Sequence, residues 1–421
     1  MRKPGSASGR CRRHGYVLVT DASENAALAI IRSLGSKGIP VAAGDHRIPS
    51  PGLASKYCTL RLRYPDPHRD KRAFLRFVLN LVRRERFDLI IPVTDITASI
   101  ISAHKKELEE HARVAIPDFG VFVKALDKAM TVKIAQENGI PCPRTFFPED
   151  VGDVKEVARI IRYPAVIKPR MKIAWSGNRA VMLKVTERNI AYGPEDLISK
   201  YERLVSEYAP FLVPDNLPLV QEYVPGVGCG VELLMARSDV KAFFMHRRLR
   251  EYPPTGGAST LRVSIRDERL YDLGVRLLRA MEWEGVAMVE FKLDPRDGVP
   301  KLMEVNGRFW GSLPLAIASG VDFPYLLYQL MVEGDVEPPG GYEIGVVRRW
   351  LLPGDMLWLL SSLAHGGGIR CIRDFVSAFR FPCDIVSADD PSPSLAALAL
   401  MFHHALDVLR GRRTLAGEIR R

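Results

Sequence analysis

The sequence predicts an α/β protein of two or three domains that ends in a small, mostly helical segment. Residues 16–43 follow a strand–helix–strand pattern, which is typical of a doubly wound α/β domain. Residues 286–306 contain two runs of strand character around the turn-rich stretch PRDG. Residues 336–421 contain two apolar runs, around Met356–Leu363 and Leu395–Leu409, that we expect to form helices. At 421 residues the chain can bury a sizeable core.

The N-terminal strand–helix–strand unit lacks a glycine loop for binding dinucleotides. Residues 16–20 are the first expected strand, the following helix ends at Gly35, and residues 39–43 are the second strand. The loop TDASENA between strand and helix contains no glycine, whereas the fingerprint GxGxxG needs glycines beside the pyrophosphate. A nicotinamide-dependent oxidoreductase of the Rossmann type is therefore disfavoured.

Several polar side chains follow expected buried strands or helices. Thr94 and Asp95 come after the strand DLIIPV, and we expect them to cap the next helix. Asp127 and Lys128 lie on helical sequence before a second helix. Lys168 ends the proline-bracketed strand YPAVIKPR, where a lysine is costly to bury without an anionic partner.

Two further strands carry charged residues. Gln221 and Glu222 are embedded in the apolar strand LVQEYVP, which precedes the flexible stretch GVGCG. Arg248 and Arg250 are two residues apart in the run AFFMHRRLREY, so we expect them to share one strand face. Taken alone, this run fits a solvated strand face and an anion site equally well.

The two strand runs AMVEFKLD and PKLMEVN predict an antiparallel hairpin. Alternation places Leu302, Glu304 and Asn306 on one face of the second strand, and pairing places Glu290 opposite Glu304. Two carboxylates and an amide oxygen would then converge beside Arg308, which suits a hard divalent cation. Spacing alone does not separate this metal site from a solvated hairpin face.

Composition narrows the possible partners. Hydrophobic residues make up 47% and charged residues 26% of the chain, as in ordinary globular proteins. The net charge of +11 comes from scattered basic residues, which favours a solvated arginine-rich surface. The functional alternatives are attraction of anionic substrates such as ATP and weak attraction to acidic membranes or nucleic acid, and we expect no nucleic-acid partner. The six cysteines form no CxxC pair, and no apolar run approaches a membrane span, so we expect a cytoplasmic protein with reduced thiols. His403 and His404 lack the further spaced ligands that a metal site needs.

These motifs resemble the ATP-grasp superfamily, in particular its carboxylate–amine ligase branch related to carbamoyl-phosphate synthase and biotin carboxylase. The resemblance covers residues 16–332. It rests on Glu290 followed by EVNGR and GVDFP, on the DK and VIKPR motifs, and on LVQEYVPG. It implies a Rossmann-like pre-ATP-grasp domain, a two-part α+β ATP-grasp domain and a small, mostly helical C-terminal extension.

The resemblance also implies domain boundaries and roles for individual residues. The expected parts are a disordered basic tail (1–14), a Rossmann-like domain (15–120), an ATP-grasp domain (121–335, with subdomains 121–220 and 221–335) and an extension (336–421). ATP would be bound by Lys128, Lys168, Gln221, Glu222, Tyr223, Val224 and Glu232. One or two Mg²⁺ ions, or Mn²⁺, would be held by Glu290, Glu304 and Asn306. Arg308 would stabilise the reacting group, and Arg248 or Arg250 would anchor a substrate carboxylate.

The implied reaction is ATP-dependent formation of an amide bond from small-molecule carboxylate and amine substrates through an acyl phosphate. The alternatives are another ATP-grasp reaction, by a carboxylase or phosphotransferase, and a nucleotide-binding module without turnover. One departure is clear: residues 171–180 contain one glycine, whereas the phosphate-covering loop of the family is glycine-rich. Such ligases are often dimers, so the resemblance is also compatible with a homodimer.

Overall fold

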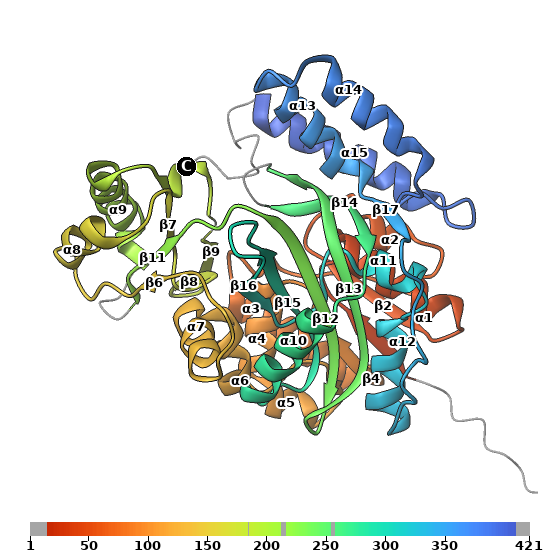
Figure 1. Ribbon diagram of the computed structural model, residues 1–421. Helices are drawn as coiled ribbons and strands as arrows, with labels where there is room; N and C mark the ends of the chain where they lie inside the picture. Colours follow the sequence, from red (N-terminus) through yellow and green to blue (C-terminus); the bar gives the residue numbers. More distant parts are fainter. Residues whose placement is uncertain (1–14, 184, 212–215, 254–256, 410–421) are drawn as a thin grey trace, which may run out of the picture.

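The computed structural model describes residues 15–183, 185–211, 216–253 and 257–409. The expected basic tail (1–14), part of the loop after Arg250 (254–256) and the side chain of His404 lie outside the described residues. The described chain forms a mixed α/β structure of three sheets and a separate two-stranded hairpin (Figure 1). This architecture confirms the predicted fold class. No helix among the described residues is both long and apolar enough to span a bilayer.

The N-terminal unit is a five-stranded parallel sheet in the order β3-β2-β1-β4-β5. Its strands are β1 (Tyr16–Val19), β2 (Val41–Asp45), β3 (Leu60–Arg63), β4 (Phe87–Ile91) and β5 (Arg113–Val114). Its helices are α1 (Asn25–Ser36), α2 (Pro51–Ala54), α3 (Lys71–Arg84), α4 (Asp95–Ala103), α5 (Lys105–Glu109) and α6 (Phe119–Leu126). The strand order reverses direction at β1 and β4, and the carboxyl ends of strands at such a switch point commonly face a ligand.

A small lobe follows, built on a four-stranded antiparallel sheet in the order β10-β7-β11-β6 (Figure 1). Its strands are β6 (Thr145–Phe146), β7 (Ala165–Lys168), β10 (Ile190–Ala191) and β11 (Leu219–Glu222). Its helices are α7 (Lys128–Glu137), α8 (Asp153–Ile160) and α9 (Pro194–Tyr208), with short 3₁₀ turns at Glu187–Asn189 and Ala209–Phe211. Between β7 and β10, β8 (Ile173–Ser176) and β9 (Arg179–Met182) form the separate hairpin.

The largest sheet is antiparallel, in the order β16-β15-β12-β13-β14-β17. Its strands are β12 (Val227–Ala236), β13 (Asp239–Tyr252), β14 (Ala258–Ser264), β15 (Gly285–Leu293), β16 (Pro300–Asn306) and β17 (Val347–Arg349). Its helices are α10 (Glu268–Ala280), α11 (Leu313–Ala318) and α12 (Phe323–Tyr328), the last continued by a π-helical turn at Gln329–Glu333. One buried cluster joins this sheet to the N-terminal sheet, because Leu18 of β1 and Val289 of β15 belong to it.

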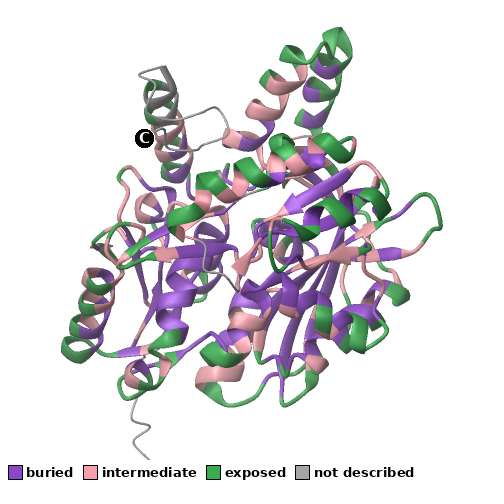
Figure 2. Ribbon diagram, turned by 90° about the vertical axis from the view of Figure 1, so that its left-hand side faces the viewer, coloured by how far each residue is buried: buried purple, intermediate pink, exposed green. Residues whose placement is uncertain are grey.

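Most of the C-terminal residues form helices at one end of the molecule (Figure 1). A π-helical turn (Leu351–Asp355) leads to α13 (Met356–Ala364), α14 (Gly368–Ser377), a 3₁₀ turn (Ala378–Arg380) and α15 (Ser392–Leu409). The sequence predicted α13 and α15 but not α14, whose exposed apolar residues alternate with arginines. The segment is not detached, because β17 pairs with β14 and Arg32 of α1 binds Asp390 with an Nε–Oδ2 distance of 2.9 Å. Figure 2 shows the buried strands at the centre, under partly exposed helices.

Candidate functional site

The β15–β16 hairpin brings two carboxylates and one amide together. Glu290 and Glu304 are paired residues, which confirms the predicted register at this position. Asn306 donates from Nδ2 to Glu290 Oε1 at 2.7 Å and lies 3.5 Å from Glu304 Oε1. Oxygen atoms from both strands therefore point to one place, as a hard cation requires.

A bulge in β16 corrects one detail of the predicted hairpin. Leu302 pairs with Phe291, whereas Glu304 pairs with the preceding residue of β15, Glu290, so Met303 is the extra residue. Leu302 therefore lies on the core face with Val305, and not beside Glu304 as strict alternation predicted. The bulge lets the strand keep a buried apolar face while it presents Glu304 on the other.

Three lysines surround Glu304. Lys128 is the first residue of α7 and Lys168 is the last residue of β7. The third, Lys172, lies just before β8 and was not among the predicted site residues. Its Nζ donates to the Val305 carbonyl oxygen at 2.7 Å and to Asn306 Oδ1 at 3.1 Å, and it lies 3.7 Å from Glu304 Oε2.

These charges shift one another's pKa values. Burial lowers the pKa of the Lys128 ammonium to about 8, against the opposing effect of Glu304. Burial lowers the pKa of Lys168 to about 8 in the same way. Burial alone would raise the pKa of the Glu304 carboxyl, but the three lysines outweigh it and lower this pKa to about 2. Glu304 is therefore ionised at neutral pH, and the site carries more positive than negative charge.

Arg308 follows β16 and connects the hairpin to the N-terminal unit. Its Nη2 lies 3.0 Å from Oδ2 of Asp95, the first residue of α4. The sequence predicted only a capping role for Asp95 and Thr94. Thr94 does cap α4 by accepting from the Thr97 amide, whereas Asp95 also holds the arginine.

Arg248 and Arg250 bind different partners, although they are two residues apart on β13. Arg248 pairs with Arg262 and Arg250 pairs with Leu261, but the register is the same on either side of this irregularity, so the alternation of β13 is not reversed. Arg248 forms a close ion pair with Glu290 through Nη2 and Oε2.

Arg250 points instead to the C-terminal segment. Its Nη1 lies 2.8 Å from Asp355 Oδ2, and its guanidinium stacks 3.9 Å from the ring centroid of Trp358. The structure therefore brings Arg248, and not Arg250, to the paired carboxylates.

The segment that links the small lobe to the large sheet contains Gln221, Glu222, Tyr223 and Val224. Gln221 is buried and donates from Nε2 to Thr145 Oγ1 at 2.8 Å. The Tyr223 amide donates to the Pro164 carbonyl oxygen at 3.0 Å. The Val224 carbonyl oxygen accepts from Lys292 Nζ at 3.3 Å. Glu222 binds Arg296, with an Oε1–Nη1 distance of 2.7 Å.

Glu232 lies deeper than the predicted ribose contact requires. It is fully buried on β12, and its Oε1 is 2.6 Å from Nδ1 of the equally buried His246. Burial raises the pKa of this carboxyl, although His246 opposes the rise. Glu232 shares the sheet face of Glu290, because its neighbour two residues away, Gly230, pairs with Glu290.

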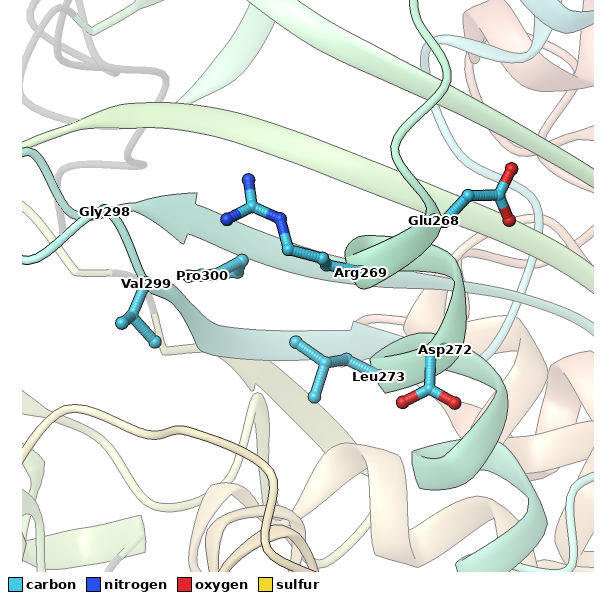
Figure 3. A pocket seen from close by; sticks show the side chains of 7 residues that line it. All are labelled: Glu268, Arg269, Asp272, Leu273, Gly298, Val299 and Pro300. Carbon is cyan, nitrogen blue, oxygen red and sulfur yellow. The ribbon is translucent and has the colours of Figure 1, made fainter.

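Two surface hollows among the described residues lie at the edge of this region. One lies between the first turn of α10 and the β15–β16 turn, and contains none of the predicted site residues (Figure 3). It is lined by Glu268, Arg269, Asp272, Leu273, Gly298, Val299 and Pro300. The other includes Glu222 and Val224 of the linking segment, together with Arg296.

Comparison with known proteins shows which family and which solved structures this chain resembles. Residues 216–348 match the family model described as ATP-grasp in the biosynthetic pathway with Ter operon. The chain is 25% identical over 256 residues to D-aspartate ligase from Enterococcus faecium, covering 56% of this chain and 58% of that protein. The biotin carboxylase domain of Hydrogenobacter thermophilus 2-oxoglutarate carboxylase, solved with MgADP, superimposes with a TM-score of 0.61 at 18% identity. That match covers 79% of this chain and 73% of that chain.

The chain contains an ATP-grasp domain.

A second relative places this domain in the predicted branch. The large chain of carbamoyl phosphate synthase from Pyrococcus furiosus is 22% identical over 221 residues, which cover 51% of this chain and 19% of that protein. The similarity therefore spans less than two thirds of either curated relative. The predicted resemblance to ATP-grasp proteins related to carbamoyl phosphate synthase and biotin carboxylase is confirmed.

The polar groups of the ATP-grasp domain fit a nucleotide with its metal. Carboxylate and amide oxygens are the ligands that Mg²⁺ prefers, and Glu290, Glu304 and Asn306 supply them. Within the described residues, Nε of Arg248 and Nε of Arg308 are buried without a hydrogen-bond partner. Such unsatisfied donors beside a surplus of lysines suit a polyanion such as a triphosphate.

The glycine-poor segment 171–180 contains most of the β8–β9 hairpin. Gly177 occupies its turn with a positive φ of 57°, which a larger side chain adopts only under strain. The hairpin contacts the N-terminal unit, since the Lys71 amide donates to the Asn178 carbonyl oxygen at 3.0 Å and the Ala180 amide donates to that of His68 at 2.8 Å. Two backbone hydrogen bonds therefore attach the hairpin to the N-terminal unit.

Proposed function

We propose that this protein is an ATP- and Mg²⁺-dependent ligase that joins a small carboxylate to an amine. One observation carries the proposal: the paired carboxylates of Glu290 and Glu304 lie among Lys128, Lys168 and Lys172. A carboxylate pair supplies ligands for a divalent cation, and the excess lysines supply partners for phosphate oxygens. The relationship to D-aspartate ligase supports a reaction that forms a C–N bond.

The nucleotide would lie between the small lobe and the large sheet. Gln221, Glu222, Tyr223 and Val224 would contact the adenine and ribose. Lys128 and Lys168 would neutralise phosphate charge, and we add Lys172 to this set. Glu290, Glu304 and Asn306 would hold Mg²⁺, which supplies charge neutralisation between the β- and γ-phosphates when bound. We retain Glu232 only as a support for the sheet face, because its burial and its bond to His246 leave it little access to ribose.

In the first step, a substrate carboxylate oxygen attacks the γ-phosphorus. The new P–O bond gives an acyl phosphate, the bond to the β-phosphate oxygen breaks, and ADP leaves. In the second step, the amine nitrogen attacks the acyl carbon, phosphate leaves, and the nitrogen loses a proton. Arg308, oriented by Asp95, would stabilise negative charge on the reacting group. Arg248 would anchor the substrate carboxylate after exchanging its contact with Glu290.

The test supplies the full chain with Mg·ATP and pools of carboxylates and amines, including D-aspartate, and follows ADP, phosphate and condensed products by mass spectrometry. We expect one pair of pools to raise ADP formation and to yield a product lighter than its two precursors by one water. A Glu304→Ala variant is the control for background hydrolysis. If no pool raises ADP formation above this control, the ligase proposal fails. ADP formation with bicarbonate or a phosphate acceptor alone would instead indicate a carboxylase or a phosphotransferase.

A further inference from the structure

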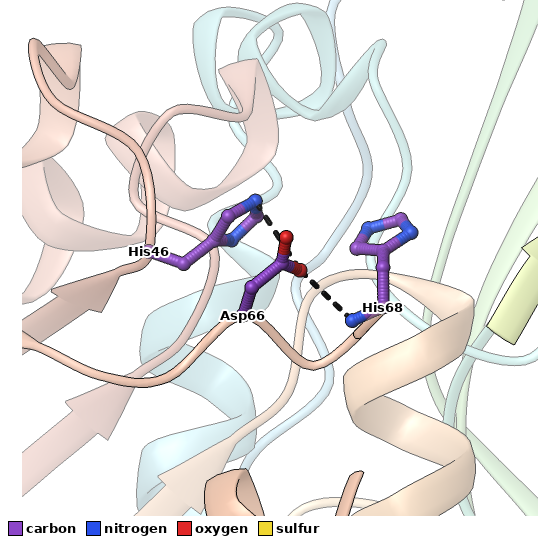
Figure 4. A group of neighbouring side chains, drawn as sticks. All are labelled: His46, Asp66 and His68. Atoms are coloured by element: carbon purple, nitrogen blue, oxygen red, sulfur yellow. Dashed lines mark hydrogen bonds and ion pairs between the residues drawn. The ribbon is translucent and has the colours of Figure 1, made fainter. Parts of the chain in front are cut away.

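A second group of potential metal ligands lies in the N-terminal unit, outside the ATP site. His46 directly follows β2, and Asp66 and His68 lie in the loop after β3 (Figure 4). One ligand atom from each side chain lies within 4.8 Å of the others. His46 Nε2 is 3.7 Å from Asp66 Oδ1, and the two imidazole centroids are 5.7 Å apart.

The bonding of these side chains leaves ligand atoms available. His46 places Nε2 near Asp66 and its buried Nδ1 3.5 Å from Asp45 Oδ1, so Nε2 is the ring nitrogen that an ion beside Asp66 would use. Asp66 Oδ1 accepts from the backbone amide of His68 at 2.9 Å, which holds the carboxylate beside the second imidazole.

The charge around the three side chains favours a cation. Two guanidinium groups, of Arg47 and Arg69, lie near the group. Besides Asp66 itself, three carboxylates lie near these guanidinium groups and the imidazoles, those of Asp21, Glu24 and Asp45. Two imidazoles and one carboxylate are ligands that borderline divalent ions such as Zn²⁺ prefer, and they differ from the all-oxygen set of the ATP site.

The loop that carries Asp66 and His68 also contacts the β8–β9 hairpin. The His68 carbonyl oxygen accepts from the Ala180 amide, and Lys71 Nζ lies 4.7 Å from the ring centroid of Trp175 in β8. Lys172, which donates to the Val305 carbonyl oxygen in the β15–β16 hairpin, directly precedes β8. A metal ion on the loop would therefore fix the position of the β8–β9 hairpin.

We propose that His46, Asp66 and His68 form a site for Zn²⁺, distinct from the Mg²⁺ site, that holds the β8–β9 hairpin in place. Three protein ligands leave one position of a tetrahedral ion open to water or another oxygen ligand. The proposal does not depend on the ligase reaction, since it concerns residues outside the ATP site.

The test is a titration of chelator-treated full-length protein with Zn²⁺, followed by calorimetry in excess Mg²⁺ to occupy the ATP site. Co²⁺ provides a second readout, because its visible absorption reports nitrogen ligands and tetrahedral geometry. His68→Ala removes one ligand, and Asp66→Asn removes the charge but keeps an oxygen for the His68 amide. His365→Ala is the matched control, since His365 is an exposed histidine of the C-terminal helices.

We expect one equivalent of Zn²⁺ to bind the wild-type protein and the His365→Ala variant alike. Both ligand variants should bind at least about 10-fold more weakly and lose the Co²⁺ spectrum. Zn²⁺ should also slow amide hydrogen exchange in residues 172–183 of the wild-type protein and of the His365→Ala variant, but not in the two ligand variants. Absence of wild-type binding, or unchanged affinity in both ligand variants, would overturn the site. Binding without slower exchange would overturn its coupling to the hairpin.

Discussion

Arg308 and Asp95 form an ion pair between two different sheets, with 3.0 Å between Nη2 and Oδ2. Asp95 belongs to the switch-point edge of the N-terminal sheet, and Arg308 follows the strand that carries Glu304. Through this ion pair the N-terminal unit helps to orient Arg308, a residue of the proposed reaction site. Arg308 overcomes the effect of burial and lowers the pKa of the Asp95 carboxyl, so the aspartate is ionised at neutral pH.

Replacing this carboxylate should slow the reaction without changing ATP affinity. In Asp95→Asn the arginine loses its charged partner and its fixed orientation. We expect kcat to fall by roughly 10- to 100-fold while the KM for ATP stays within about 2-fold. Asp118→Asn is the control, because Asp118 is an exposed aspartate paired with Lys105. An equal fall in both variants, measured by steady-state ADP release, would contradict the assignment.

Arg248 and Arg250 form a matched pair for testing substrate binding. Arg248→Ala should raise the KM of the carboxylate substrate more than that of ATP, because only this arginine lies beside Glu290. Arg250→Ala should leave both KM values nearly unchanged. It should instead destabilise the fold by about 1–3 kcal/mol, because the buried Asp355 loses one charged partner but keeps Arg349 and Thr260. Steady-state kinetics and thermal unfolding of both variants measure these effects. A raised carboxylate KM in Arg250→Ala, with an unchanged KM in Arg248→Ala, would contradict the prediction and place Arg250 at the substrate.

Lys172 should be as important as the two predicted lysines. Its removal in Lys172→Met takes away the lysine nearest to Glu304 and the donor to Asn306. We expect kcat to fall by about 100-fold or more, as when a single electrostatic donor is lost from other active sites. Lys155→Met, at an exposed position, should behave like wild type. Near-normal turnover of Lys172→Met would remove this lysine from the proposed site.

Much of the fold follows from local patterns, and so does the Glu290–Glu304 pairing. The turn-rich PRDG stretch and the strand alternation were sufficient to pair these two carboxylates. The bulge at Met303 was not predicted, because the apolar Met303 between Leu302 and Val305 hides the break in the alternation. This bulge explains why Leu302 lies on the face opposite to the one expected.

Contacts between distant segments account for the other omissions. In the sequence, the segment that contains Lys172 differs from the family pattern only by its few glycines. The groups to which Lys172 donates lie more than a hundred residues away along the chain. Asp95 was read as a helix cap because its local sequence suits one, and its bond to Arg308 depends on how the two sheets meet. A search for every charged residue directly after a buried strand would have selected Asp95, but would not have named its partner.

Nucleotide binding should weaken as the pH rises through the pKa values of the two buried lysines. Both values are lowered to about 8, so each ammonium is charged at pH 7 and mostly neutral at pH 9. If phosphate binding needs both charges, the Kd of ATP should increase by about 10- to 100-fold over this range. Lys168→Arg, which keeps its charge throughout, should show a shallower profile. A flat profile for the wild-type protein in calorimetry would contradict the role of these lysines.

The linked effect on stability has the opposite sign. A lysine whose folded pKa lies below its unfolded value binds fewer protons in the folded state between about pH 8 and its ordinary value. These two groups therefore favour the folded state increasingly as the pH rises through this window. Without nucleotide, Lys128→Met should reduce this gain, which urea unfolding at two pH values would detect.

We propose that Glu304 and its neighbours hold the metal of bound ATP. The most direct test of this proposal is the equilibrium Kd of a non-hydrolysable ATP analogue, measured with and without Mg²⁺ in wild-type protein, in Glu304→Gln and in Glu282→Gln, an exposed control. We predict that Mg²⁺ tightens binding at least about 10-fold in the wild type and the control but has little effect in Glu304→Gln, which remains folded. Equal tightening in all three proteins, or full turnover of Glu304→Gln, would contradict the account.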